Sequence, residues 1–299
     1  DKVTVIDNLS TGYLSNIPEQ VNFIEGDASD DLTISQLEDQ KFDAILHLAG
    51  QSSGEISFDD PVYDLNCNVT STLRLLDYAV RTKCKRFIYA SSMSIYGENR
   101  NQEKFSELDE VNPKSFYAVG KLTSEKYLKI YHNQYGINFT SLRYFNVYGP
   151  NEYHKQDMQS MVRKGFLQLR DTGRLRLFKS YKSEYSDGDQ ERDFLYIKDA
   201  VAMTLFFLER QDVGGIFNVG SGKARNWNDL AKAIFVAMSK KLNIEYIDMP
   251  SEIRNHYQYH TCSDTEKIRN AGYSKPAMSL EAGIENYVTQ YLIPEKHLG

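Results

Sequence analysis

The stretch Tyr117-Ala118-Val119-Gly120-Lys121 opens a long helical pattern and places a tyrosine and a lysine four residues apart. Residues at this spacing lie on the same face of a helix. Ser115 is a suitable N-cap, and Gly136 can adopt the left-handed conformation that ends a helix, so we expect a helix over residues 116–135. A neighbouring lysine cation lowers the pKa of a tyrosine, which suits such a pair to acid–base chemistry. Alone, this motif is weak in a chain with 21 tyrosines.

Strand and helix patterns alternate on both sides of this stretch. The expected strands are residues 3–6, 21–24, 42–48, 86–90 and 138–145, and the expected helices are residues 32–37 and 62–80. This alternation predicts an α/β fold, a Rossmann-like doubly wound parallel sheet. In such sheets ligands bind beyond the carboxyl ends of the strands. Polar or small residues follow the strands there: Asp7, Asp27, Ala49-Gly50, Ser91-Ser92 and Asn146.

After Pro150 the pattern loosens into a smaller mixed α/β lobe. Expected helices cover residues 157–170, 226–238 and 280–291, with a short one after Asp264, and expected strands cover residues 174–178, 194–197, 215–219 and 244–247. We therefore predict a nucleotide-binding domain over residues 1–150 and a mainly substrate-binding lobe over 151–299. Residues 194–219 can return to the first domain.

Composition excludes several classes of protein. A net charge of −6 and a pI near 5.6 argue against a nucleic-acid-binding surface. No apolar run approaches the ~20 residues that span a bilayer, and no signal peptide is visible. The cysteines Cys67, Cys84 and Cys262 are scattered, and the six histidines form no ligand cluster, so we expect no metal and a cytoplasmic location.

Five motifs together resemble the extended short-chain dehydrogenase/reductases that epimerise nucleotide sugars. They are SSMSIYG at 91–97, YAVGK at 117–121, RYFNVYGP at 143–150, RDFLYIKD at 192–199 and NVGSG at 218–222. They occur in the family's order and cover most of the chain. The resemblance implies an isomerase that transiently oxidises its sugar to a ketone with a bound NAD or NADP.

The resemblance also implies a role for each matching residue. Tyr117 would exchange the hydroxyl proton, Lys121 would hold the nicotinamide ribose and lower the tyrosine pKa, and Ser92 would bind the reacting oxygen. Asp7 would accept the adenosine ribose hydroxyls, which favours NAD over NADP. The cofactor-binding set is Asp7, Asn8, Asp27, Ala28, Leu48, Ala49, Gly50, Asn68, Ser91, Tyr117, Lys121 and Tyr144. The substrate-binding set is Ser92, Asn146, Lys155, Phe178, Arg192 and Tyr257.

The two halves of the chain favour different sugars. Residues 148–155 and 271–276 resemble the ADP-glycero-manno-heptose 6-epimerases of lipopolysaccharide core synthesis, in which Lys155 would be a second acid–base residue on the opposite face of the sugar. Residues 50–58 resemble instead the UDP-hexose 4-epimerases of surface polysaccharide synthesis. We weight the heptose reading higher because substrate contacts come mostly from the second half. The alternative for Lys155 is that it is an ordinary solvated surface lysine.

Two further alternatives remain open. A 4,6-dehydratase is less favoured, because Ser92-Met93-Ser94 lacks the Asp-Glu pair of those enzymes. A non-catalytic sugar-nucleotide-binding relative is favoured by one feature: the family's first strand and its G-x-x-G-x-x-G loop do not precede Asp1. Because the downstream site residues are intact, we expect an incomplete record of an active enzyme. A nucleotide sugar is the expected partner, and a homo-oligomer the expected assembly.

Overall fold

A four-stranded parallel sheet forms the centre of the computed structural model, which describes residues 1–38, 40–98, 103–254 and 257–297. Its strand order is β3 (Ala44–His47), β4 (Arg86–Ser92), β5 (Asn138–Tyr144) and β9 (Gly215–Val219). Every neighbouring pair in this sheet is parallel. The predicted α/β fold with a parallel sheet is thereby confirmed.

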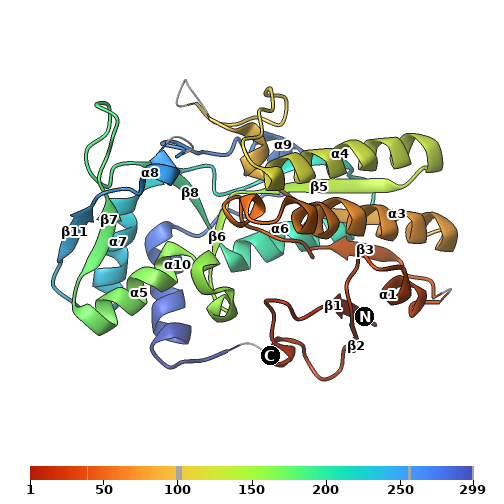
Figure 1. Ribbon diagram of the computed structural model, residues 1–299, viewed down its shortest axis with the longest axis horizontal. Coiled ribbons are helices and arrows are strands. Elements are labelled where there is room, and N and C mark those ends of the chain that lie inside the picture. The colour runs from red at the N-terminus through yellow and green to blue at the C-terminus, as the bar shows by residue number, and fades with distance from the viewer. Residues whose placement is uncertain (39, 99–102, 255–256, 298–299) are drawn as a thin grey trace.

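Helices cover both faces of this sheet (Figure 1). On β4, Phe87 and Tyr89 pack in one core cluster with residues of α3 (Ser71–Thr82) and α4 (Phe116–Tyr135). Ile88 points the other way, into a cluster with residues of α6 (Ile197–Glu209). Successive side chains of a strand face opposite sides, so a continuous apolar strand is buried between two helical layers.

Helix α4 begins and ends where the sequence predicts. The Ser115 hydroxyl accepts a hydrogen bond from the Ala118 amide at 3.2 Å, which satisfies one of the free donors of the first turn. At the other end Gly136 has φ 69°, and its amide donates to the His132 carbonyl at 2.9 Å. The two caps fix the start of α4 against β4, where Tyr117 and Lys121 lie.

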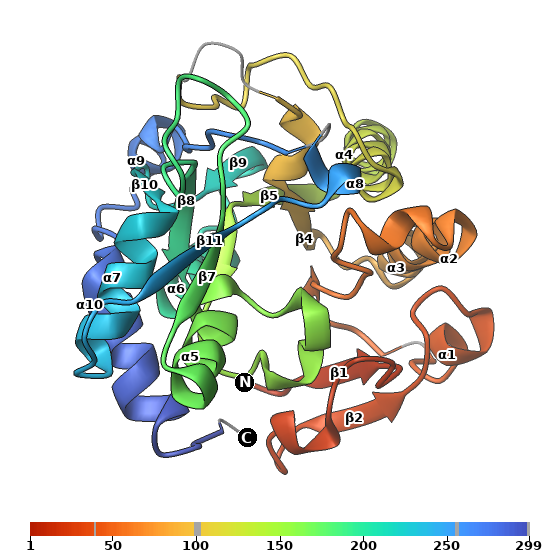
Figure 2. The same cartoon turned by 60° about the vertical axis from the view of Figure 1, so that its left-hand side comes forward.

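The amino-terminal part forms a separate parallel pair of strands, β1 (Thr4–Asp7) and β2 (Asn22–Glu25), joined through η1 (Leu14–Asn16). Figure 2 shows this pair below α2 (Pro61–Leu65) and α3, beside α1 (Asp31–Ser35). The predicted helix over 62–80 is present, but a π-helical turn, η3 (Asn66–Thr70), joins α2 to α3. Such turns are frequent at functional sites.

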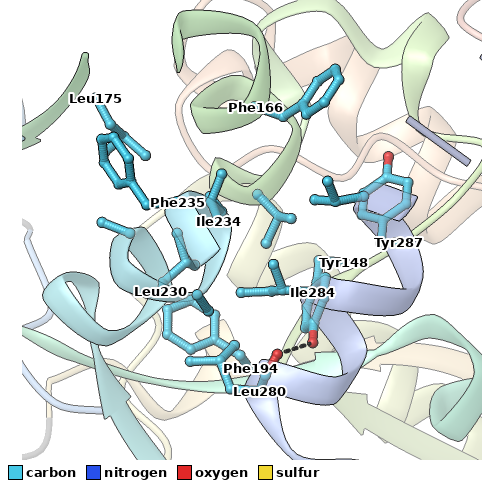
Figure 3. Packing of buried hydrophobic residues seen from close by; sticks show 14 of the residues in the cluster. Tyr148, Phe166, Leu175, Phe194, Leu230, Ile234, Phe235, Leu280, Ile284 and Tyr287 are labelled. Atoms are coloured by element: carbon cyan, nitrogen blue, oxygen red, sulfur yellow. Dashed lines mark hydrogen bonds between the residues drawn. The ribbon is translucent and has the colours of Figure 1, made fainter. Parts of the chain in front are cut away.

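The second lobe packs around its own apolar core (Figure 3). Tyr148 and Phe166 meet Leu230 and Ile284 there. Its strands are β6 (Asn146–Tyr148), β7 (Leu175–Phe178), β8 (Glu191–Tyr196), β10 (Ala224–Asn226) and β11 (Ile244–Ile247). Its helices are α5 (Met161–Thr172), α7 (Trp227–Ala237), α8 (Ser251–Arg254) and α10 (Leu280–Tyr287), whereas α9 (Glu266–Asn270) packs against β9 of the central sheet. The remaining short helical turns are η2 (Ile56–Phe58), η4 (Met93–Tyr96), η5 (Tyr153–Met158) and η6 (Val288–Leu292).

Some predicted boundaries are wrong. The strand expected over 194–197 is β8, which starts at Glu191, and α6 begins at Ile197 although no helix was expected there. Residues 200–208 of α6 are almost all apolar, so helical periodicity is weak. The helix expected from 157 begins only at Met161, after η5. Within the described part of the chain, no helix is both long and apolar enough to cross a bilayer.

Candidate active site

Three predicted catalytic residues meet at the carboxyl end of β4. Ser92 ends that strand and hydrogen-bonds Tyr117, which lies in the first turn of α4. Lys121, one turn further, donates from Nζ to the Ala90 carbonyl at 2.9 Å. Its Nζ lies 5.7 Å from the centroid of the Tyr117 ring. A hydroxyl, a phenol and an ammonium therefore share one small, buried region.

Burial dominates the electrostatics of this region. It raises the pKa of Tyr117, while the hydrogen bond with Ser92 acts in the opposite direction. Burial lowers the pKa of Lys121 to about 8, against an opposing effect of Asp64. The effect of Lys121 on the Tyr117 pKa stays a prediction; in this structure the Lys121 ammonium is held by the Ala90 carbonyl.

A polar cradle lies beside this group, after β3. Asn68 is fully buried, and its Nδ2 donates to the Gln51 carbonyl and to Asp64 Oδ1, both at 3.1 Å. Its Oδ1 has no partner among the described residues. Gly50 has φ +149°, and a Cβ there would lie 2.5 Å from Asn68 Oδ1 and 3.3 Å from Lys121 Nζ. A glycine is thus required where these two polar atoms converge.

The predicted adenosine-binding residues gather at the carboxyl ends of β1 and β2. Asn8 Nδ2 donates to Asp27 Oδ2 at 3.0 Å, and Asp7 Oδ1 accepts from the Leu9 amide at 2.7 Å. Burial acts to raise the pKa of Asp27, but hydrogen bonds from Ser29 and Asn8 prevail and lower it. The carboxylates therefore lie on adjoining strands, as the parallel register of β1 and β2 requires.

The other predicted cofactor residues differ in exposure and in the direction of their side chains. Leu48 and Ala49 are exposed just after β3, whereas Ala28 is buried in the core against α3. Ser91 donates to Glu125 at 2.7 Å, so its hydroxyl faces the protein interior. The Tyr144 hydroxyl lies 2.6 Å from Thr204 of α6, which turns this side chain to the opposite face of the sheet from α4.

The predicted substrate side contains a buried cation among aromatic rings. Arg192, on β8, is 8% exposed, and its guanidinium carbon lies 4.9 Å from the Tyr257 ring and 5.6 Å from the Trp227 ring. In the described residues no carboxylate forms an ion pair with it. Burial lowers its pKa. Asn146 begins β6 and Phe178 ends β7, and the Asn146 Oδ1 also lacks a described partner.

Lys155 lies on η5, a segment that crosses towards the β1–β2 loop. Its neighbours Tyr153 and His154 contact the Tyr13 ring in a tilted and an edge-on arrangement, with ring centroids 5.4 and 5.7 Å away. The far end of η5 reaches the loop after β3, where Met158 Sδ lies 4.0 Å from Ser52 Oγ. Among the described residues, the Lys155 ammonium makes no hydrogen bond or ion pair, and no contact joins it to Tyr117.

Two polar residues of this region were not predicted. Asp64 is 1% exposed and accepts from Gln51 Nε2 at 3.1 Å, and Glu125 is equally buried one turn beyond Lys121. Their spacing offered a signal. Asp64 precedes Asn68 by four residues and Glu125 follows Lys121 by four, which places each on the same helix face as a predicted site residue.

Comparison with known proteins gives consistent matches. Residues 1–220 match the model of the family described as "NAD dependent epimerase/dehydratase family". The ADP-L-glycero-D-manno-heptose-6-epimerase of Nitratidesulfovibrio vulgaris (strain DP4) is 37% identical, covering 98% of this chain and 90% of the relative.

Two solved structures show the same fold. The UDP-N-acetylglucosamine 4-epimerase of Methanobrevibacter ruminantium M1, in complex with UDP-N-acetylmuramic acid, has a TM-score of 0.87 at 27% identity. It covers 99% of this chain and 91% of that one. The ADP-L-glycero-D-manno-heptose-6-epimerase of Helicobacter pylori has a TM-score of 0.79 at 27% identity, covering 97% and 87% of the two chains.

Proposed function

Since the chain belongs to the NAD dependent epimerase/dehydratase family, we propose that it inverts carbon 6 of an ADP-linked glycero-manno-heptose. The chain is an NAD(P)-dependent nucleotide-sugar epimerase, an isomerase. The heptose is supported above all by the relatives named 6-epimerases, which align over nearly the whole chain. This assignment places the enzyme in lipopolysaccharide synthesis.

The residues at the end of β4 account for the acid–base part of the reaction. The Tyr117 oxygen exchanges the proton of the sugar hydroxyl when the carbon is oxidised or reduced on the face that Tyr117 serves, and Lys155 is the proposed acid–base residue for the opposite face. Ser92 holds the sugar oxygen within reach of the phenol, and Lys121 supplies a cation that stabilises the phenolate. The bound nicotinamide cofactor supplies the two-electron oxidation and reduction of the sugar carbon.

The residues present fit a nicotinamide cofactor. The Asn68 Oδ1, which has no partner among the residues that the structure describes, and the Lys121 ammonium converge at Gly50. Together they offer an acceptor and a donor for a ribose diol. At the other end, Asp7, Asn8 and Asp27 offer acceptors for the adenosine. We propose that Leu48, Ala49 and Gly50 line the path between them, and that Ala28, Ser91 and Tyr144 support the site through packing.

NAD is favoured over NADP because of Asp7. A carboxylate directly after the strand accepts the ribose hydroxyls, whereas it would repel a 2′-phosphate. We expect Asp7→Ala to weaken NAD binding by ~10-fold, the loss of hydrogen bonds to a charged group. Asp43→Ala is the matched control, since Asp43 is exposed and precedes β3 at the opposite end of the strands. Equal NAD affinity of Asp7→Ala and wild type in a fluorescence titration would remove Asp7 from the site.

The nucleotide-sugar diphosphate is assigned to Arg192. A buried guanidinium that has no carboxylate partner in the described part of the chain needs an anion to offset the loss of hydration. The Tyr257 and Trp227 rings hold its plane in place, and Trp227 Nε1 donates to the Tyr257 hydroxyl at 2.9 Å. Asn146 and Phe178 complete the proposed substrate side. Residues 151–299 are accordingly the proposed substrate-binding lobe, and residues 1–150 the proposed cofactor domain.

A homo-oligomer is the proposed assembly. Exposed apolar side chains gather on α2 and at the start of α4, with Phe58 beside them, and Phe58 and Phe116 contact edge to face at 5.5 Å. Val62 and Leu65 of α2 are 67% and 50% exposed. Such a strip suits contact with a second copy of the chain. The cytoplasm is the proposed compartment, in keeping with three free cysteines.

The proposal is tested by incubating the protein and NAD with ADP-D-glycero-D-manno-heptose and following the 6-epimer by chromatography. UDP-glucose and UDP-N-acetylglucosamine are run in parallel. Conversion of the heptose at least 100-fold faster than either UDP-sugar supports the proposal. The reverse order would favour a UDP-hexose 4-epimerase, for which the higher TM-score of a 4-epimerase structure is the specific support. Loss of water from a sugar would indicate a dehydratase, and binding without turnover a non-catalytic relative.

A further inference from the structure

Asp64, on α2, is a buried carboxylate that the acid–base chemistry above does not use. Its Oδ1 accepts hydrogen bonds from Gln51 Nε2 and Asn68 Nδ2, both at 3.1 Å. Its Oδ2 faces α4 at Gly120, where an added Cβ would lie 3.5 Å from that oxygen. The carboxylate therefore lies at contact distance from the turn of α4 that joins Tyr117 to Lys121.

No direct ion pair satisfies this carboxylate within the described ranges of the chain. Its charge nevertheless acts on both catalytic groups. It raises the pKa of Tyr117, in the same direction as the larger effect of burial, and it raises the pKa of Lys121 against burial. In return, Lys121 and Asn68 act to lower the pKa of Asp64, although burial prevails and raises it. The three groups are coupled through a medium of low dielectric constant.

Four further titratable groups surround Lys121, and none of them supplies an anion near neutral pH. They are His47 from β3, Cys67 from η3, Tyr89 from β4 and Tyr117 from α4 itself. Burial lowers the pKa of His47 to about 3, so this side chain stays neutral. Burial raises the pKa values of Cys67 and Tyr89, which keeps both protonated. Asp64 is the carboxylic acid of this group.

We propose that Asp64 is a positioning residue whose carboxylate is the counter-charge of the Tyr117–Lys121 pair and sets the pH range in which that pair exchanges protons. This inference rests on the proposed epimerase function. Two coupled groups lose their protons in two steps that belong to the pair. An anion beside both groups opposes each loss of a proton. Removing the anion therefore shifts both steps to lower pH.

The Asp64→Asn variant tests this directly. The bell-shaped pH profile of kcat should shift to lower pH on both limbs, by about one pH unit, the ordinary effect of one nearby charge. A role limited to packing would lower the height of the bell without moving it. Asp60→Asn is the matched control. Asp60 is exposed at the start of the same helix and accepts from the Tyr63 amide at 2.9 Å, a cap that asparagine replaces well.

A second measurement needs no turnover. Ultraviolet titration reports tyrosine ionisation, and subtracting the Tyr117→Phe curve isolates the Tyr117 phenolate. The isolated step should move to lower pH in the Asp64→Asn background and stay in place with Asp60→Asn. If neither the ionisation of Tyr117 nor the pH profile of kcat moves in Asp64→Asn, the proposal is overturned. If wild-type protein converts no sugar nucleotide, the epimerase assignment fails, whereas the titration still decides the role of Asp64.

The variant is expected to fold, because the amides that Asp64 binds have other acceptors. Gln51 Nε2 also donates to the Ser53 carbonyl at 2.7 Å, and Asn68 Nδ2 to the Gln51 carbonyl at 3.1 Å. Circular dichroism checks this. If Asp64→Asn is unfolded, Asp64→Leu, whose side chain has the same branched shape, takes its place in both measurements. The same shift to lower pH is expected, and an unmoved step would again overturn the proposal.

Discussion

Arg143 and Glu125 form a buried ion pair directly behind the catalytic residues. Arg143 Nη2 lies 2.7 Å from Glu125 Oε2, and Nε lies 3.0 Å from Oε1. Glu125 Oε1 also accepts from the Ser91 hydroxyl at 2.7 Å and the Ser141 hydroxyl at 3.1 Å. One carboxylate thus ties α4 to both β4 and β5, one turn beyond Lys121. This tie fixes the distance between the helix that carries Tyr117 and the strand that carries Ser92.

Replacing Glu125 with glutamine should therefore be costly. The change leaves the Arg143 guanidinium buried without a counter-charge, which typically costs about 3–5 kcal/mol of unfolding free energy. Urea denaturation measures this loss. The double variant Glu125→Gln with Arg143→Met should recover part of it, since no unpaired charge remains. Asp171→Asn, which breaks the exposed Arg170–Asp171 ion pair, is the control and should change the unfolding free energy little. If Glu125→Gln costs no more than this control, the buried geometry is contradicted.

Lys121 should lower the stability of the protein while serving its chemistry. Its pKa falls from 10.5 in the unfolded chain to about 8 in the fold, so between these values the unfolded state binds more protons. Unfolding free energy contributed by this group therefore rises with pH across that window and is lowest below pH 8. Lys121→Met should stabilise the protein at pH 7 by up to about 3 kcal/mol.

The difference between the two proteins should narrow as the pH increases from 8 towards 10.5, because Lys121 loses its proton in the folded state and no buried charge remains. Urea denaturation of wild type and Lys121→Met at pH 7, 8 and 9 follows this trend. A constant difference would mean that lost contacts, rather than the charge, determine the effect. Lys240→Met, at an exposed lysine beyond α7, should show no such pH dependence.

Gly97, which follows η4 beside the site, should not tolerate alanine. Its φ is +73°, and a Cβ there would lie 2.2 Å from the Asn112 carbonyl oxygen, a backbone atom that cannot move aside. Gly173 has a nearly equal φ of +71° but no atom within 4 Å of its Cβ position. Gly173→Ala should therefore cost only the left-handed backbone strain, about 1 kcal/mol. Gly97→Ala should cost at least twice as much in thermal denaturation. Equal costs would place the Asn112 carbonyl elsewhere.

The sequence alone predicted the elements that local rules control. The caps at Ser115 and Gly136 define α4, and apolar runs ending in polar residues locate β3, β4 and β5. The sequence could not predict α6, because its apolar residues lie on the exposed face as well as the buried one, as Val201 and Leu205 do, and so show little periodicity. Nor could it place β6 and β10, whose three residues each depend on pairing with β8.

The candidate site shows the same division. Ser92, Tyr117 and Lys121 follow from motif and spacing, and the structure brings them together. Asp64 was missed because a carboxylate in a helix usually faces solvent, and only the tertiary fold buries it under α4. Tyr144 was expected at the cofactor, but the strand's alternation directs it to α6. Side-chain direction on a strand depends on register, which the motif does not specify.

The remaining prediction concerns Tyr117 and Lys155. Inverting one carbon through a ketone requires proton transfer at opposite faces of the sugar, and one side chain on α4 serves only one of them. Lys155 is the proposed partner, because η5 reaches the loop after β3 through Met158 and Ser52.

Tyr117→Phe and Lys155→Met should each reduce epimerisation ~10²–10⁴-fold. A mixture of the two should still dismutate an aldehyde analogue of the sugar, since each retains one acid–base group. Lys240→Met should leave turnover intact. If Lys155→Met does so too, Lys155 is a solvated surface lysine and the heptose assignment loses its main residue. Fast conversion of UDP-glucose to UDP-galactose by that variant would then make the 4-epimerase the better assignment.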